Sequence, residues 1–168
     1  MASSTALRIQ VGDLLKRVGS QRSISLTATL RDLAVGLTLV DENEAVDVET
    51  TFERIPEGVV VRGSIATRWH APCSRCLQPT GGDQRTFVDE LFESDAVPGE
   101  TYPLDGEILD LEPMVRDAIV LELPQAPLCA DDCAGLCPNC GVDRNTTACS
   151  CAHDESDPRW AALGSLEL

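Results

Sequence analysis

The eight cysteines of this 168-residue chain fall into two short stretches, and their spacing restricts the fold more than any other feature. The first stretch holds Cys73 and Cys76, and the second holds the other six, Cys129, Cys133, Cys137, Cys140, Cys149 and Cys151. The segment CPNCG at 137–141 has the form of a zinc knuckle, in which two thiolates on a tight turn bind one ion and glycine permits the turn. The pattern therefore calls for a choice between a metal site and a disulfide framework.

The beginning of the chain bears on that choice. The segment MASSTALRIQVGDLLKRV lacks the apolar core and the small-residue cleavage site of a signal peptide. The sequence contains no run of about eighteen apolar residues that could span a bilayer. We therefore expect a cytoplasmic protein with no membrane contact. Because the cytosol keeps thiols reduced, we interpret the cysteines as metal ligands.

Structural zinc takes four ligands, so eight thiols allow one or two zinc ions. One division is local: Cys137, Cys140, Cys149 and Cys151 would hold one ion, and Cys73, Cys76, Cys129 and Cys133 would hold another. A rival division joins the two C-x-x-C pairs, Cys73–Cys76 and Cys137–Cys140, around one ion. The sequence leaves both divisions open. With eight thiols present, we expect His70 and His153 to be surface imidazoles.

Alternating apolar residues predict a sheet. Val46 to Phe52 and Val59 to Trp69 alternate around the turn Pro56-Glu57-Gly58, which favours an antiparallel hairpin. Similar alternation predicts strands near 24–30, 33–39 and 84–93, and places the first cysteine pair at one edge of the sheet. We expect a short helix over 11–18, loops at 41–45 and 94–109, and a longer helix over 110–123, with Asp110 as N-cap and Pro124 as terminator.

These elements predict an α+β fold, in which an antiparallel meander packs against one helix and carries a C-terminal cysteine-rich lobe. We divide the chain into a core domain at 1–124 and a zinc-binding lobe with a short C-terminal helix at 125–168, the helix over 157–166. The lobe has too little apolar surface to fold alone, so a bound ion is the expected source of its stability.

The formal net charge is −15, and it is unevenly distributed. Residues 86–135 contain thirteen acids and a single basic residue, Arg116. Such a surface repels phosphates at long range and attracts basic proteins. The same charge also suits an ordinary solvated surface, and from the sequence alone we favour that interpretation.

Four segments resemble the YceD-like family of large ribosomal RNA subunit accumulation proteins. They are CSRCL (73–77), DLEPMVRDAIVLELP (110–124), LCADDCAGLCPNCGVDRN (128–145) and DPRWAAL (157–163). The resemblance implies a bacterial-type cytosolic factor needed for normal levels of large-subunit ribosomal RNA, in a family not known for enzymatic activity. It also implies that the cysteines from Cys73 to Cys149 belong to the family's pattern.

Two functional hypotheses follow. In the first, the protein binds precursor RNA of the large subunit or an assembly intermediate, and Arg62, Arg68, Arg75 and Arg85 are the candidate RNA contacts. In the second, the protein is an acidic holder for a basic, zinc-binding ribosomal protein of the large subunit. An enzyme is disfavoured, because the sequence has no Gly-rich phosphate loop, no GxSxG and no HExxH, and all-sulfur zinc sites are closed to substrate.

Overall fold

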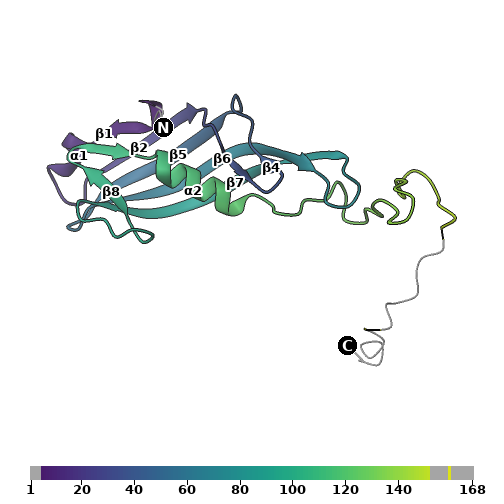
Figure 1. Ribbon diagram of the computed structural model, residues 1–168. Coiled ribbons are helices and arrows are strands. Elements are labelled where there is room, and N and C mark those ends of the chain that lie inside the picture. The colour runs from purple at the N-terminus through teal and green to yellow at the C-terminus, as the bar shows by residue number, and fades with distance from the viewer. Residues whose placement is uncertain (1–4, 152–158, 160–168) are drawn as a thin grey trace.

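The computed structural model describes residues 5–151 and residue 159, and is dominated by one sheet (Figure 1). In chain order its elements are η1 (Thr5–Leu7), β1 (Arg8–Gln10), α1 (Gly12–Leu15), β2 (Gln21–Ala28), β3 (Ala34–Val35), β4 (Thr38–Leu39), β5 (Val46–Arg54), β6 (Val59–Pro72), β7 (Pro79–Glu93), β8 (Tyr102–Asp105), β9 (Ile108–Asp110) and α2 (Glu112–Glu122). None of the helices in these ranges is both long and apolar enough to cross a bilayer.

The centre of the sheet is the long hairpin β6–β7, and the hairpin predicted around Pro56-Glu57-Gly58 is formed by β5 and β6. It pairs in register from Val59↔Phe92 to Pro72↔Pro79, and β5 pairs with the other edge of β6 from Asp47↔Ala66 to Arg54↔Val59. β2 in turn pairs with β5. β5 pairs with β6 only as far as Ala66, whereas the β6–β7 hairpin continues to Pro72 and Pro79. The turn that carries Cys73 and Cys76 follows there. That turn lies at the tip of a central hairpin, whereas the sequence placed it at a sheet edge.

The sheet is mixed, which corrects the expectation of a purely antiparallel meander. β8 pairs in parallel with the end of β7 through Phe92↔Tyr102 and Glu93↔Pro103. The chain turns back at Val97, whose carbonyl accepts hydrogen bonds from the backbone N–H groups of Glu100 and Thr101. The segment from 94 to 101 therefore brings the chain back so that β8 runs in the same direction as β7.

Three local expectations were also wrong. The predicted loop at 94–109 contains β8 and β9, joined at Gly106, whose φ is +59°. The predicted strand at 33–39 is a small hairpin, β3–β4, folded at Gly36. The predicted helix at 11–18 is limited to α1, because Gly19 and Ser20 bond to the backbone of Arg54. The expected loop at 41–45 lies outside every strand.

The core lies on one face of the sheet. Val46, Val48 and Phe52 of β5 point to this face and are buried, whereas Asp47 and Glu49 between them are exposed. α2 packs across this face (Figure 1) and buries Met114, Val115 and Ile119, together with residues of η1 and α1. Alternation on the strands and helical spacing on α2 therefore converge on one apolar layer.

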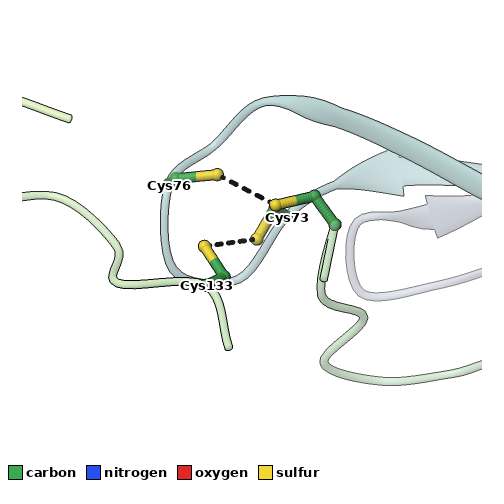
Figure 2. A group of neighbouring side chains, drawn as sticks. Cys73, Cys76 and Cys133 are labelled. Carbon is green, nitrogen blue, oxygen red and sulfur yellow. Dashed lines mark hydrogen bonds between the residues drawn. The ribbon is translucent and has the colours of Figure 1, made fainter. Parts of the chain in front are cut away.

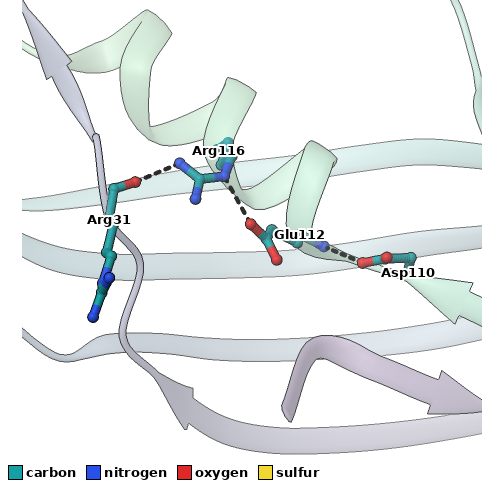
Figure 3. A network of polar contacts seen from close by, with 4 residues as sticks. All are labelled: Arg31, Asp110, Glu112 and Arg116. Atoms are coloured by element: carbon teal, nitrogen blue, oxygen red, sulfur yellow. Dashed lines mark hydrogen bonds and ion pairs between the residues drawn. The ribbon is translucent and has the colours of Figure 1, made fainter. Parts of the chain in front are cut away.

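A polar network fixes the start of α2 (Figure 3). Asp110 accepts a hydrogen bond from the Glu112 N–H at 3.1 Å. The N-cap is Leu111, which makes no side-chain capping bond, so the prediction of Asp110 as N-cap was wrong by one residue. The Glu112 side chain is 11% exposed, and its carboxylate accepts a bond from Arg116 Nε at 2.9 Å. Arg116 also donates to the Arg31 carbonyl at 2.6 Å, which ties the helix to the segment before β3.

We expect Arg116→Ala to lower the free energy of unfolding by about 1–3 kcal/mol, because the substitution removes a charged partner from a buried carboxylate. Arg8→Ala is the matched control. Its ion pair with Asp110 is exposed and 3.9 Å long, so its loss should cost less than about 1 kcal/mol. Urea denaturation of both variants measures the difference, and equal effects would contradict this role for the network.

Candidate metal centres

The eight cysteines form two groups of four. Within each group all four sulfurs lie within 4.8 Å of one another: Cys73, Cys76, Cys129 and Cys133 in the first tetrad, and Cys137, Cys140, Cys149 and Cys151 in the second. This grouping is the local division of the sequence analysis and differs from the rival one. His70 lies 3.3 Å from Asp41 on the surface, and His153 lies outside the described residues.

The first tetrad joins the hairpin tip to the C-terminal segment. Cys73 and Cys76 come from the β6–β7 turn, and their sulfurs lie 3.8 Å from Cys133 and 3.5 Å from Cys129, respectively. These partners are 60 and 53 residues apart in sequence. Figure 2 shows the sulfurs of Cys73, Cys76 and Cys133 converging from the turn and from the facing segment.

The sulfur separations distinguish a metal site from a disulfide. A disulfide brings its sulfurs to about 2.05 Å. A tetrahedron with Zn–S bonds of about 2.3 Å has S···S edges of about 3.8 Å. The separations here are 3.8 and 3.5 Å in the first tetrad and 3.4 Å between Cys137 and Cys149 in the second. Each tetrad can therefore hold one metal ion with little rearrangement.

Both tetrads are built on the same backbone turn. In the first, Leu77 N–H donates to the Cys73 carbonyl and Cys73 N–H donates to the Gln78 carbonyl. In the second, Gly141 N–H donates to the Cys137 carbonyl and Cys137 N–H donates to the Val142 carbonyl. The residue after each C-x-x-C pair has a positive φ, +63° at Leu77 and +74° at Gly141. CSRCL and CPNCG are thus two copies of one knuckle.

Two residues connect the hairpin tip, the first tetrad and the second knuckle. Arg75 donates to the Cys133 carbonyl at 3.0 Å, and its own carbonyl accepts from Leu136 N–H. Asn145 donates to the Cys133 sulfur at 3.4 Å and accepts from Ala134 N–H at 2.7 Å. Asn145 was missed in the sequence analysis, although Asp-x-Asn at 143–145 is a recognisable Asx-turn signature.

The protein environment divides the thiols of each tetrad by acidity. Burial acts to raise the pKa of Cys73, but backbone N–H groups, those of Cys76 and Arg75 first, bring it down to about 6. N–H groups of Cys140 and Asn139 lower the pKa of Cys137 to about 6. Hydrogen bonding with neighbouring thiols raises the pKa of Cys129 and Cys151 to about 12. Each tetrad therefore presents one ready thiolate and one thiol that ionises only when a cation displaces its proton.

The four candidate RNA-contacting arginines lie on or beside the β6–β7 hairpin. Arg62 lies 2.9 Å from Glu53 and 3.0 Å from Asp89, Arg68 lies 2.9 Å from Asp83, and Arg85 lies 3.2 Å from Glu49. The fourth, Arg75, donates to Cys133 as described above. Three of the arginines thus have carboxylate partners on other strands of the sheet, so this group of arginines carries less net positive charge than the sequence suggested.

A sheet packed against one helix is thus followed in the chain by the segment that completes the two cysteine tetrads. The model of the family described as large ribosomal RNA subunit accumulation protein YceD matches residues 61–167, from within β6 through both tetrads. This chain therefore belongs to the YceD family, which confirms the resemblance seen in its motifs. No solved structure matches it.

Curated relatives extend the match. An uncharacterized protein of Mycobacterium tuberculosis is 38% identical over 138 residues, which cover 77% of this chain and 66% of that protein. One of Mycobacterium leprae is 34% identical over 157 residues, covering 85% and 70%. Large ribosomal RNA subunit accumulation protein YCED homolog 1, chloroplastic, of Arabidopsis thaliana is 31% identical over 65 residues, covering 39% and 20%. The chain thus spans just under two thirds of the length of the M. tuberculosis protein.

Because the two knuckles share one backbone turn, alanine should weaken zinc binding at Gly141 but not at Leu77. Gly141→Ala places a Cβ in a left-handed conformation at a cost of about 1 kcal/mol, so zinc should bind the second tetrad about fivefold more weakly. Leu77→Ala is the matched control, since Leu77 already has a Cβ at the same φ and its side chain is 61% exposed. Chelator competition measures both affinities, and equal losses in the two variants would contradict the shared geometry.

The pKa values of the cysteine thiols predict that zinc affinity depends on pH. Reduced protein freed of metal should take up two zinc ions per chain, and each ion should displace protons from thiols such as Cys129 and Cys151. Affinity should therefore rise between pH 6 and pH 8, by at least about tenfold per unit where one proton is released. Competition with a chelator of known pH dependence measures this. An affinity independent of pH, or uptake of no zinc, would contradict the assignment.

Proposed function

We propose that this chain is a non-enzymatic factor that supports accumulation of large-subunit ribosomal RNA, acting in the cytoplasm by binding precursor RNA or an assembly intermediate. The match of the YceD family model to residues 61–167 carries this proposal. That region contains the β6–β7 hairpin, α2 and both cysteine tetrads. The Arabidopsis relative is named as a large ribosomal RNA subunit accumulation protein.

In this proposal each tetrad binds one zinc ion, and the ion has a structural role. A site of four thiolates leaves no open position for substrate or activated water, as a catalytic zinc would require. The first ion would hold the segment at 129–133 against the hairpin tip, and the second would close the knuckle at 137–151. Since the lobe has little apolar surface of its own, the bound ions would supply the free energy that keeps it folded.

Direct RNA binding would use the exposed arginines of the hairpin. Arg62, Arg68 and Arg85 have half or more of their side-chain surface exposed, so a phosphate could replace their carboxylate partners at modest cost. Arg75 would act differently. Its guanidinium donates to the Cys133 carbonyl, so its substitution would disturb the first tetrad as well as any RNA contact.

A second candidate is an acidic holder for a basic ribosomal protein of the large subunit. The carboxylate partners of Arg62, Arg68 and Arg85 favour it, because they leave the sheet with a surplus of negative charge in a chain of net charge −15. Opposite charge speeds association with a basic protein. The effect on ribosomal RNA would then be indirect.

Depletion of the protein in its source organism should lower the ratio of large-subunit to small-subunit ribosomal RNA. The wild-type gene should restore the ratio, whereas a Cys73→Ser, Cys133→Ser double variant should not, because it loses two ligands of the first tetrad. Gln78→Ala, in the same turn, is the control and should restore it, because the Gln78 side chain is exposed and the substitution keeps its backbone bond to Cys73. Quantitative electrophoresis of total RNA measures the ratio.

An unchanged ratio after depletion would contradict the proposed function. Purified zinc-loaded protein then separates the two candidates. Direct RNA binding predicts an affinity for large-subunit precursor RNA that falls steeply with salt concentration. The absence of such affinity at low salt, together with a reduced ratio in cells, would leave the acidic holder.

A further inference from the structure

The face of the sheet opposite α2 carries polar and charged side chains from four adjacent strands. On β6 and β7 the register places Arg62 beside Asp89, Ser64 beside Phe87, Ala66 beside Arg85 and Arg68 beside Asp83. β5 contributes Asp47, Glu49, Thr51 and Glu53, and β2 contributes Gln21, Ser23, Ser25 and Thr27. We call this surface the outer face. Most of its side chains are exposed, in contrast to the buried face under α2.

Phe87 places an exposed aromatic ring on the outer face. The other aromatic residues in the described part of the chain, Phe52, Trp69, Phe92 and Tyr102, lie in the core or pack against it. Phe87 is 78% exposed, and the residue directly across from it is Ser64. Aromatic residues are common in strands, and single exposed apolar side chains are common on protein surfaces. The functional meaning of Phe87 therefore depends on the charged residues around its exposed ring.

A hollow of about 400 Å³ lies next to Phe87 on the outer face. Ala66 and Arg85, which form the neighbouring rung of the β6–β7 ladder, line it together with Glu44, Asp47, Arg68 and Asp83. Within this lining Arg68 pairs with Asp83, and Arg85 pairs with Glu49 just outside it. The Asp47 carboxylate accepts a hydrogen bond from the Thr27 hydroxyl at 2.6 Å. The hollow is therefore acidic, because its arginines are matched by carboxylates while Glu44 and Asp47 add negative charge.

We propose that the outer face around Phe87 is the docking surface for a basic protein segment. One arginine or lysine of that segment would stack on the Phe87 ring, and a second would enter the hollow beside Glu44 and Asp47. An aromatic ring attracts a cation at its face, and carboxylates at the rim add a charge-assisted hydrogen bond. This inference deepens the second candidate of the proposed function and rests on it.

Charge decides between a basic protein and RNA as the occupant. The strands of the outer face present five carboxylates, those of Asp47, Glu49, Glu53, Asp83 and Asp89, against the three arginines Arg62, Arg68 and Arg85. A nucleobase could stack on Phe87, but its phosphates would meet a surplus of negative charge. A cationic peptide would be attracted both by the Phe87 ring and by the surplus of negative charge on the outer face.

Fluorescence anisotropy with a labelled nona-arginine peptide and the zinc-loaded full chain tests the proposal. Phe87→Ala leaves the net charge unchanged, yet it should weaken peptide binding by about fivefold to tenfold. Glu44→Gln with Asp47→Asn should weaken it to a similar extent. Leu121→Ala is the matched control, since Leu121 is 84% exposed on α2, away from the outer face, and binding should not change. Circular dichroism verifies that each variant is folded.

Three results would overturn the proposal: no binding of the peptide at low salt, equal affinity of Phe87→Ala and wild type, or Phe87-dependent binding of a twelve-nucleotide oligouridine in place of the peptide. The last would make the outer face an RNA platform. None of these outcomes bears on the ribosomal RNA ratio in depleted cells. Failure of the docking surface is therefore distinguishable from failure of the proposed function.

Discussion

The convergence of four sulfur atoms at the tip of the β6–β7 hairpin is the constraint on which the C-terminal part of the structure depends. Cys73 and Cys76 lie on a turn of the sheet, and Cys129 and Cys133 belong to a segment without regular secondary structure. Few apolar side chains surround them; Leu128 and Leu136 are the partly buried ones. Hydrophobic burial cannot hold such a segment in place, so the sulfurs and the backbone bonds around Arg75 must do so.

The elements with strong periodicity could be predicted from the sequence, and those created by turns could not. The β5–β6–β7 meander and α2 follow from alternation and from helical spacing with Asp110 and Pro124 at its ends. β8 and β9 were read as loop because each is short and gains its stability from pairing with distant strands, including β1. The parallel pair of β7 and β8 depends on a reversal at Val97 that leaves no clear pattern in the sequence.

At the candidate metal centres, the cysteine spacing allowed the two tetrads that the structure shows. The spacing alone could not favour them over the rival division that joins the two C-x-x-C pairs. The choice is tertiary: Arg75 and Gly135 come into close contact, which brings Cys133 against Cys73. The arginines illustrate a second limit. Their alternation on β6 was visible in the sequence, but the carboxylates opposite them become apparent only when the register is known. The exposure of Phe87 could not be predicted either, because alternation alone does not say which face of a strand is covered.

The hydrogen bond from Asn145 to the Cys133 sulfur links the two tetrads physically. Asn145 lies three residues after Val142, which completes the knuckle that begins at Cys137. The side-chain and backbone N–H groups of Asn145 donate to the Asp143 carboxylate at 2.7 and 2.9 Å, which positions the amide. A knuckle closed by contacts near in sequence can assemble before the long-range set, since its loop closure costs less entropy. Once closed, it presents the amide that orients Cys133, so capture of one ion would prepare the chain for the other, and loading would be ordered and cooperative.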